Sequence, residues 1–124
     1  MAKAKQASEK TDIAKFIIEA IQDKKGKEIK LVDLRNVSGA VCDYFIICHG
    51  ESSTQIQAIA ESVEKKVKSD LNEFPYGKEG LQNSEWILLD YVDVVVHLFR
   101  RETREFCGIE DLWGDAEITA IAES

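Results

Sequence analysis

The sequence predicts an α/β fold: a single domain in which a mixed β-sheet is flanked by helices. Three observations lead to this prediction. The chain has 124 residues, the length of one domain. Two stretches, after Thr11 and after Ser52, repeat apolar residues at helical spacing. Four short stretches between and after them have the composition of strands, and helices and strands interleaved in this way build a sheet with helices against it.

The first helix is predicted from Thr11 to Lys25, and its apolar positions lie on one face: Ile13, Phe16, Ile17, Ala20 and Ile21. Lys24 and Lys25 supply the cationic last turn, and Gly26 the stop, that such a helix favours. Residues 1–7 are small and polar, so we expect a frayed terminus there. Residues 28–34 alternate apolar and polar side chains, which predicts a half-buried strand, and residues 36–41 form a connector.

Residues 44–48 form a continuous apolar run that is too short for a helix and has no polar face. This pattern predicts a central strand covered on both sides. Ser52 with Gln55 three residues later is a capping-box pattern, which begins the second helix. Pro75 opens a stretch without regular structure that extends to residue 85.

The last two strands are predicted at residues 86–90 and 94–99. Only Tyr91 and Val92 lie between Asp90 and Asp93, so a tight antiparallel hairpin is the economical connection. The long helix after the second strand indicates a crossover, and crossover plus hairpin make the sheet mixed. Residues 101–109 have helical composition, and Leu112 with Trp113 is expected to pin this helix to the body.

We therefore divide the chain into a flexible N-terminus (1–10), one domain (11–113) and an acidic C-terminal tail (114–124). With 16 Lys and Arg against 23 Asp and Glu, the net charge is −7. This charge disfavours direct nucleic-acid binding, which needs cations to displace phosphate counterions, and favours a basic partner protein. No apolar run approaches the roughly 20 residues of a membrane helix, and residues 1–10 lack a secretory core, so we expect a cytoplasmic protein.

An enzyme hypothesis rests on a serine loop and two carboxylates. Residues 50–53 (GESS) lie between a strand and a helix N-terminus, where backbone N–H groups can hold an anion. Asp90 and Asp93 flank the hairpin, and a pair of acids can hold Mg²⁺ against phosphates in nucleotidyl transfer. However, the chain has no P-loop or glycine-rich fingerprint, and no Lys or Arg adjoins the serine loop. A helix cap and turn-forming aspartates explain these residues better.

Nucleophilic and zinc chemistry find less support. Cys48 and His49 are adjacent on one strand, so their side chains point to opposite faces. Neither His49 nor His97 belongs to a zinc-binding pattern, so we expect no metal and no cofactor.

A binding hypothesis rests on the hairpin. Trp86, Leu88 and Asp90 share one strand parity, and His97 and Phe99 share a parity on the next strand. An aromatic residue within an acidic and apolar strip is typical of a protein-binding face. The alternative for Trp86 is ordinary packing in the core.

Three blocks of the sequence resemble the ribosomal silencing factor (Iojap-like) family. The first is residues 42–53 (CDYFIICHGESS), followed by residues 59–61 (IAE). The second is Glu79-Gly80 followed by residues 86–99 (WILLDYVDVVVHLF). The third runs from residues 104–106 (REF) to residues 110–113 (EDLW). The blocks lie between residues 42 and 113, and the resemblance as a whole covers about residues 13–113.

This resemblance implies a fold of the nucleotidyltransferase-like superfamily without transferase activity, and so a protein that is not an enzyme. It implies binding to the large ribosomal subunit through one ribosomal protein on the face that meets the small subunit. The bound factor would obstruct subunit joining and repress translation under nutrient limitation. An acidic module suits a basic ribosomal protein, and rRNA would repel it elsewhere.

The resemblance also implies site residues, which we take to bind the partner: Glu79, Gly80, Trp86, Leu88, Asp90, Asp93 and His97. Trp86 would be an apolar anchor, Glu79 and Asp90 would meet basic groups, and Asp93 with His97 would shape the hairpin. The chain departs from the family at two positions. Val92 stands where glycine is usual and resists positive φ, so its turn is of another type or is strained. Cys107 stands where an aromatic residue is common.

Two alternatives remain at this stage. One is a nucleotidyltransferase-like enzyme that uses Asp90 and Asp93 with Mg²⁺. The other is a homodimer that pairs the Trp86 face with its own copy.

Overall fold

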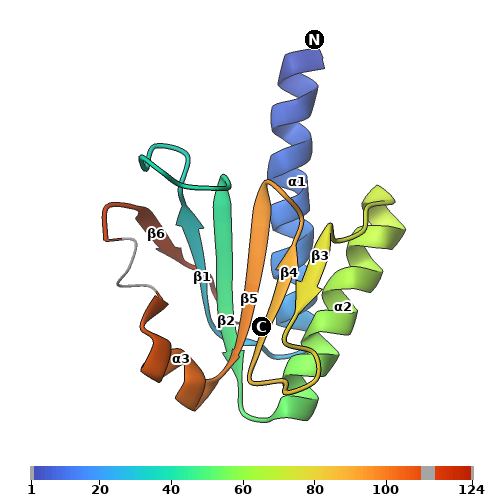
Figure 1. Cartoon of the computed structure of the whole chain (residues 1–124). Helices are drawn as coiled ribbons and strands as arrows, with labels where there is room; N and C mark the ends of the chain where they lie inside the picture. The colour runs from blue at the N-terminus through green and yellow to red at the C-terminus, as the bar shows by residue number, and fades with distance from the viewer. Residues whose placement is uncertain (1, 110–113, 124) are drawn as a thin grey trace.

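Six strands form one sheet in the order β3-β4-β5-β2-β1-β6 (Figure 1). The computed structural model describes the backbone of residues 2–109 and 114–123, with side chains from residue 13 onward in these ranges. In chain order, the elements are α1 (Ala2–Asp23), β1 (Lys27–Asp33), β2 (Tyr44–Gly50), α2 (Ser53–Leu71), β3 (Gly77–Glu79), β4 (Trp86–Asp90), β5 (Val94–Arg100), α3 (Arg101–Cys107) and β6 (Glu117–Ala120).

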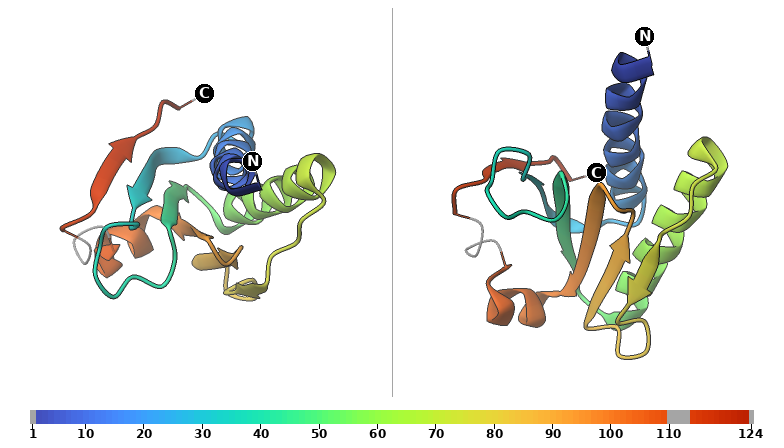
Figure 2. Two further views of the ribbon diagram at one scale, coloured as in Figure 1. Left: turned by 90° about the horizontal axis from the view of Figure 1, so that it is seen from above. Right: turned by 45° about the horizontal axis from the view of Figure 1, so that its top comes forward.

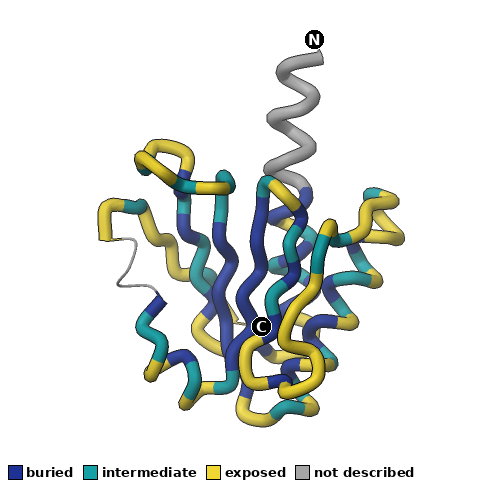
Figure 3. The backbone as a smooth tube through the Cα atoms, viewed as in Figure 1, coloured by how far each residue is buried: buried dark blue, intermediate teal, exposed yellow. Residues whose placement is uncertain are grey.

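The predicted α/β domain with a mixed sheet is confirmed. β2 and β5 are parallel neighbours, with Tyr44 paired to Val94 and Gly50 to Arg100, and α2 lies on the crossover between them. The remaining neighbours are antiparallel, including the β4–β5 hairpin. β2 is buried from Phe45 to Gly50, as its continuous apolar run predicts, and Figure 3 shows the burial concentrated in β2 and β5.

α1 and α2 cover one face of the sheet (Figure 2). Their apolar stripes pack with the inward side chains of the central strands into the larger core, whose members include Ile17, Ile21, Ile46, Ile56, Ile59, Val63, Val96 and Leu98. None of the helices in the described ranges is both long and apolar enough to cross a membrane.

The N-terminus of α2 has the capping box that the sequence predicts. Ser52 is extended (φ −146°), and its Oγ accepts a hydrogen bond from the Gln55 N–H at 3.1 Å. The Gln55 Oε1 in turn accepts from the Glu51 N–H at 2.8 Å. The serine loop therefore begins a helix, and its polar groups satisfy backbone donors.

The other face of the sheet has a smaller core near β1, β2 and α3, formed by Val32, Leu34, Phe45, Ile47, Val95, Phe99 and Ile109. α3 lies beside the lower end of this face in Figure 1. No helix of the described residues crosses this face over β4 and the upper part of β5 (Figures 1 and 2).

Two expectations about the first helix are wrong. α1 begins at Ala2 and not at Thr11, so residues 2–7 are helical instead of frayed. Residues 2–10 have no glycine or proline and are mostly good helix formers, a signal that the apolar periodicity does not report. The helix also ends at Asp23, so Lys24 and Lys25 follow it instead of forming its last turn, and Lys25 is left-handed (φ 63°).

Two strands are missing from the prediction. β3 lies inside the stretch that Pro75 opens, and β6 lies inside the acidic tail, where it pairs antiparallel with β1. The tail is therefore part of the sheet. The predicted contact of Leu112 and Trp113 lies outside the described residues.

Candidate partner-binding face

The residues predicted to bind a partner come together on the sheet face that points away from α1 and α2. Strand pairing sets Glu79 beside Leu88 and Leu88 beside His97, so these three residues form a row across β3, β4 and β5. Trp86 pairs with Phe99, and Gly77 with Asp90, on the same face. We call the set Glu79, Trp86, Leu88, Asp90, His97 and Phe99 the open face.

Trp86 is the exposed aromatic residue of the open face. It is 38% exposed, whereas Phe99 beneath it is fully buried. The two rings stack with centroids 4.9 Å apart and an interplanar angle of 26°. Its indole Nε1–H donates a hydrogen bond to His97 Nδ1 at 3.1 Å. One side of the ring is thus anchored to the sheet and the rest is accessible, so neither full core packing nor a free side chain describes this residue.

His97 is buried, at 4% exposure, in the middle of β5. Its imidazole makes a T-shaped contact with the Phe45 ring, with centroids 4.5 Å apart and an interplanar angle of 70°. Burial lowers the pKa of His97 from 6.5 to about 4, because the charged imidazolium would lose its hydration. The ring is therefore neutral at pH 7, and because Nδ1 accepts from Trp86, the proton is on Nε2. Nε2 has no hydrogen-bond partner among the described residues.

Gly80 has a conformational role that its place in the motif does not reveal. Its φ is +82°, and a Cβ at this position would lie 1.9 Å from the Trp86 carbonyl oxygen. The Gly80 carbonyl accepts from the Ser84 N–H at 2.9 Å, which closes the turn from β3 toward β4. Glycine at this position lets β3 turn back closely enough to place Glu79 beside Leu88.

Asp90 holds the hairpin turn. Its Oδ1 accepts from the Val92 N–H at 2.8 Å, and the Tyr91 N–H donates to the Val94 carbonyl at 2.9 Å. Val92 has φ 73°, and the Asp93 N–H donates to the Tyr91 carbonyl at 2.9 Å. Of the two alternatives for this turn, the strained one is confirmed: a three-residue turn closes around a β-branched residue.

Asp93 links the hairpin to the strand beside it. Its carbonyl accepts from the Asp43 N–H at 2.9 Å and from the Tyr44 N–H at 3.1 Å. The backbone of Asp93 therefore joins the start of β5 to the start of β2.

The layout required by the transferase alternative is not present. The serine loop follows Gly50 at the end of β2, whereas Asp90 and Asp93 lie at the opposite end of the parallel strand pair. A seven-residue strand spans roughly 20 Å, so the loop and the carboxylates do not share a site. Within residues 13–109 and 114–123, no three or more His, Cys, Asp or Glu side chains gather in a way that could hold a metal ion.

Sequence reasoning missed a polar cluster under α3. Arg104 is 6% exposed; its Nη1 donates to the Glu28 carbonyl at 2.8 Å and lies 3.0 Å from His49 Nδ1. Burial, followed by the charge of Arg104, lowers the pKa of His49. His49 faces this cluster while Cys48 belongs to the core beneath α1 and α2, so the two side chains do point to opposite faces. The cluster links α3 to β1 through Arg104. The local sequence around Arg104 does not indicate that its side chain is buried.

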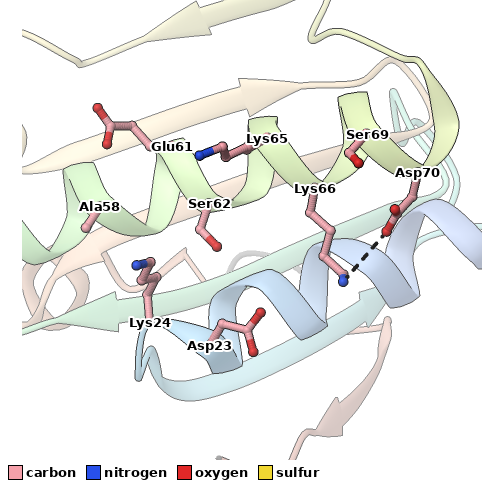
Figure 4. Close-up of a pocket in the computed structure, with 9 residues that line it drawn as sticks. All are labelled: Asp23, Lys24, Ala58, Glu61, Ser62, Lys65, Lys66, Ser69 and Asp70. Atoms are coloured by element: carbon pink, nitrogen blue, oxygen red, sulfur yellow. Dashed lines mark ion pairs between the residues drawn. The ribbon is translucent and has the colours of Figure 1, made fainter.

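Two grooves that α1 helps to line lie away from the open face. One of about 480 Å³ runs between α1 and α2 on the other side of the sheet (Figure 4). Its charges alternate in sign, and Lys66 pairs with both Glu19 and Asp70 at 3.6 Å. Another, of about 360 Å³, lies between α1 and the residues Leu31 and Tyr44. None of the predicted binding residues lines either groove.

Comparison with known proteins identifies relatives over almost the whole chain. Residues 6–124 match the family described as "Ribosomal silencing factor during starvation". A ribosomal silencing factor of Bacillus subtilis is 41% identical over 110 residues, which cover 88% of this chain and 91% of that protein. A mouse protein named "Mitochondrial assembly of ribosomal large subunit protein 1" is 36% identical over 77 residues, covering 57% of this chain and 32% of that protein.

Solved structures agree. A crystal structure of a Chromobacterium violaceum protein superimposes with a TM-score of 0.78 at 38% identity, covering 84% of this chain and 85% of that one. A crystal structure from Bacillus halodurans gives a TM-score of 0.73 at 31% identity, with 90% and 98% covered. Sequence and fold therefore lead to the same conclusion: the chain belongs to the ribosomal silencing factor family.

Proposed function

We propose that this protein binds the large ribosomal subunit through a ribosomal protein on its subunit-joining face, blocks joining of the small subunit and so represses translation under nutrient limitation. Two lines of support come from the comparisons. The family description names silencing during starvation, and the mouse relative is named for assembly of the ribosomal large subunit. We further propose that the protein acts in the cytoplasm.

The observation that carries the proposal is the open face. It has an apolar centre, made by the half-exposed Trp86 and the partly buried Leu88, with the carboxylates of Glu79 and Asp90 on the same face. Protein interfaces share this layout: buried aromatic anchors lie in the centre and charged groups around them. A partner with an apolar socket and basic residues around it fits such a surface.

The net charge supports a protein partner over RNA. A chain with a net charge of −7 is repelled by rRNA and attracted to a basic ribosomal protein. Docking would therefore be steered toward a basic protein and away from RNA.

The proposed mechanism is steric and requires no catalytic group. A body of 14.0 kDa on the joining face occupies the space that the small subunit needs. Repression then depends on how long the factor stays bound, and so on the quality of its interface.

The test is co-sedimentation of the purified full chain with isolated large subunits, followed by a subunit-joining assay. Trp86→Ala should weaken binding by about 1–2 kcal/mol or more, because it removes the central anchor. Phe74→Ala is the matched control: Phe74 is also an exposed aromatic residue, at 63%, but follows α2 and is not part of the open face.

Three outcomes would count against the proposal. Unchanged binding of a folded Trp86→Ala variant removes Trp86 from the interface. Concentration-dependent dimerisation that Trp86→Ala abolishes would assign the open face to a second copy of the chain. Binding of a nucleoside triphosphate with Mg²⁺ that requires both Asp90 and Asp93 would favour the enzyme alternative.

A further inference from the structure

His97 is an unfavourable choice for its position. It is the only polar residue between Val94 and Phe99, and it is buried. Its Nε2–H lacks a partner among the described residues, and a buried donor without an acceptor destabilises a fold. Leucine has a similar volume and no such donor. The reason for a histidine must therefore lie in its other ring nitrogen.

The Nδ1 atom is that reason. It accepts the hydrogen bond from Trp86 Nε1 at 3.1 Å, and an indole has no other polar atom. Stacking on Phe99 alone restrains the plane of the indole only loosely, because a ring can slide and turn over an apolar surface. A buried acceptor at one fixed point selects one orientation, with the Nε1 edge toward the sheet and the opposite edge toward solvent.

The acceptor is itself held in place. Phe45 makes a T-shaped contact with the imidazole at a centroid distance of 4.5 Å, and the Phe99 ring lies within 13° of parallel to it at 6.2 Å. Burial keeps the pKa of His97 far below 7, so Nδ1 remains unprotonated and able to accept under ordinary conditions.

We propose that His97 is a positioning residue for partner binding: its Nδ1 holds the Trp86 indole in the orientation that the partner meets. The proposal rests on the proposed function for the identity of the partner. A side chain that is ordered before binding loses less conformational freedom when the complex forms, so affinity is gained without a new contact.

Four variants distinguish the loss of the hydrogen-bond acceptor at position 97 from a change in side-chain volume. His97→Leu removes the acceptor and keeps an apolar side chain of similar size. His97→Asn keeps an acceptor, since its Oδ1 is the same number of bonds from Cα as the His97 Nδ1 that accepts from Trp86 Nε1. Trp86→Phe keeps a ring on Phe99 but removes the donor. Should His97→Leu fail to fold, His97→Met replaces it, because methionine fills a similar volume and has no nitrogen or oxygen acceptor.

The first measurement needs no ribosome. In the ¹⁵N-labelled full chain, the Trp86→Phe variant assigns the Trp86 indole N–H resonance, as the only other tryptophan is Trp113. His97→Leu should shift this resonance and speed its exchange with water by about tenfold or more, and His97→Asn should restore much of the protection. Unchanged shift and exchange in His97→Leu would show that no such hydrogen bond orients the indole, and the proposal would be wrong.

The second measurement is affinity for isolated large subunits. His97→Leu should weaken binding by about tenfold, and His97→Asn should stay within about threefold of the original. In the Trp86→Phe background, His97→Leu should have almost no further effect, because the two residues act through one bond. Two results would contradict a positioning role. One is a loss of affinity from His97→Leu that is as large in the Trp86→Phe background as in the original protein. The other is a His97→Leu variant whose indole resonance changes while its affinity stays the same.

The two proposals can fail separately. If the unaltered protein does not bind large subunits, the proposed function fails. The indole resonance then decides alone whether His97 orients Trp86.

Discussion

The backbone of Val92 adopts a conformation that β-branched residues avoid. Its φ of 73° lies in the left-handed region, where a Cβ crowds the following carbonyl. Val92→Gly should therefore raise the free energy of unfolding by about 1 kcal/mol, because relief of strain exceeds the added flexibility of the unfolded chain. Urea denaturation measures this change. Val92→Ala keeps a Cβ and should gain clearly less; equal gains for both variants would contradict the strain argument.

The burial of His97 makes the stability of the fold depend on pH. The pKa of His97 is about 4 in the folded protein and 6.5 as a free side chain. Between these values the unfolded chain binds a proton that the folded chain excludes, so the free energy of unfolding falls as pH falls through this window. The stability that the fold gains from a neutral His97 is therefore complete above pH 6.5 and fully lost below pH 4.

This predicts a difference between the original protein and His97→Leu. Going from pH 7 to pH 5, the original should lose about 2 kcal/mol more of its free energy of unfolding than the variant. Both proteins share the carboxylates and His49, so the comparison isolates position 97. Urea denaturation at the two pH values measures it, and equal losses would show that His97 is not excluded from protonation in the fold.

At the scale of elements, the short strand β3 depends on one glycine. A side chain at Gly80 would meet the Trp86 carbonyl oxygen and would also require a φ of +82°. Gly80→Ala should lower the free energy of unfolding by about 2 kcal/mol or more and separate β3 from β4. Gly39 is a matched control, because its φ is +83° but nothing lies within 4 Å of a Cβ there.

The two substitutions share the backbone strain and differ only in the clash. Gly39→Ala should therefore cost clearly less than Gly80→Ala in the same urea titration. If both cost the same, the close approach of β3 to β4 is not the reason for glycine at position 80.

β3 and β6 also show where prediction from sequence stops. Both are short edge strands with mostly exposed side chains, so neither has the alternation that reveals a half-buried strand. β6 is held by contacts from distant parts of the chain. Its residues pair with β1, Gln22 Nε2 donates to the Ala122 carbonyl at 2.7 Å, and Glu123 Oε2 accepts from the Glu28 N–H at 2.9 Å. Such strands exist because a partner strand is already in place.

At the scale of the whole molecule, net charge predicts how binding responds to salt. An acidic chain with a charge of −7 that docks on a basic protein should bind more weakly as ionic strength rises, since exposed charges are screened within about 10 Å at 0.1 M salt. Co-sedimentation with large subunits at 50, 150 and about 300 mM salt tests this dependence. Glu79→Gln should make the affinity depend less on salt concentration. Glu61→Gln, on α2 and away from the open face, should leave this dependence unchanged. A salt-independent affinity would contradict the charge argument.

The open face was partly predictable. Strand parity placed Trp86, Leu88 and Asp90 on one face of their strand and His97 with Phe99 on one face of the next. The observed register sets the two groups side by side. Parity could not show that Trp86 donates to His97, or that Glu79 joins the row, because both depend on how separate strands align.

The sequence by itself determined the α/β class, the crossover and hairpin, and the family, because these follow from local periodicity and from motifs in order along the chain. The tertiary structure alone decided three other things: the edge strands β3 and β6, the buried histidine behind the exposed tryptophan, and the separation of the serine loop from Asp90 and Asp93. The physical reason is the same in each case. Strand register and burial depend on contacts between residues far apart in sequence, and no local pattern encodes them.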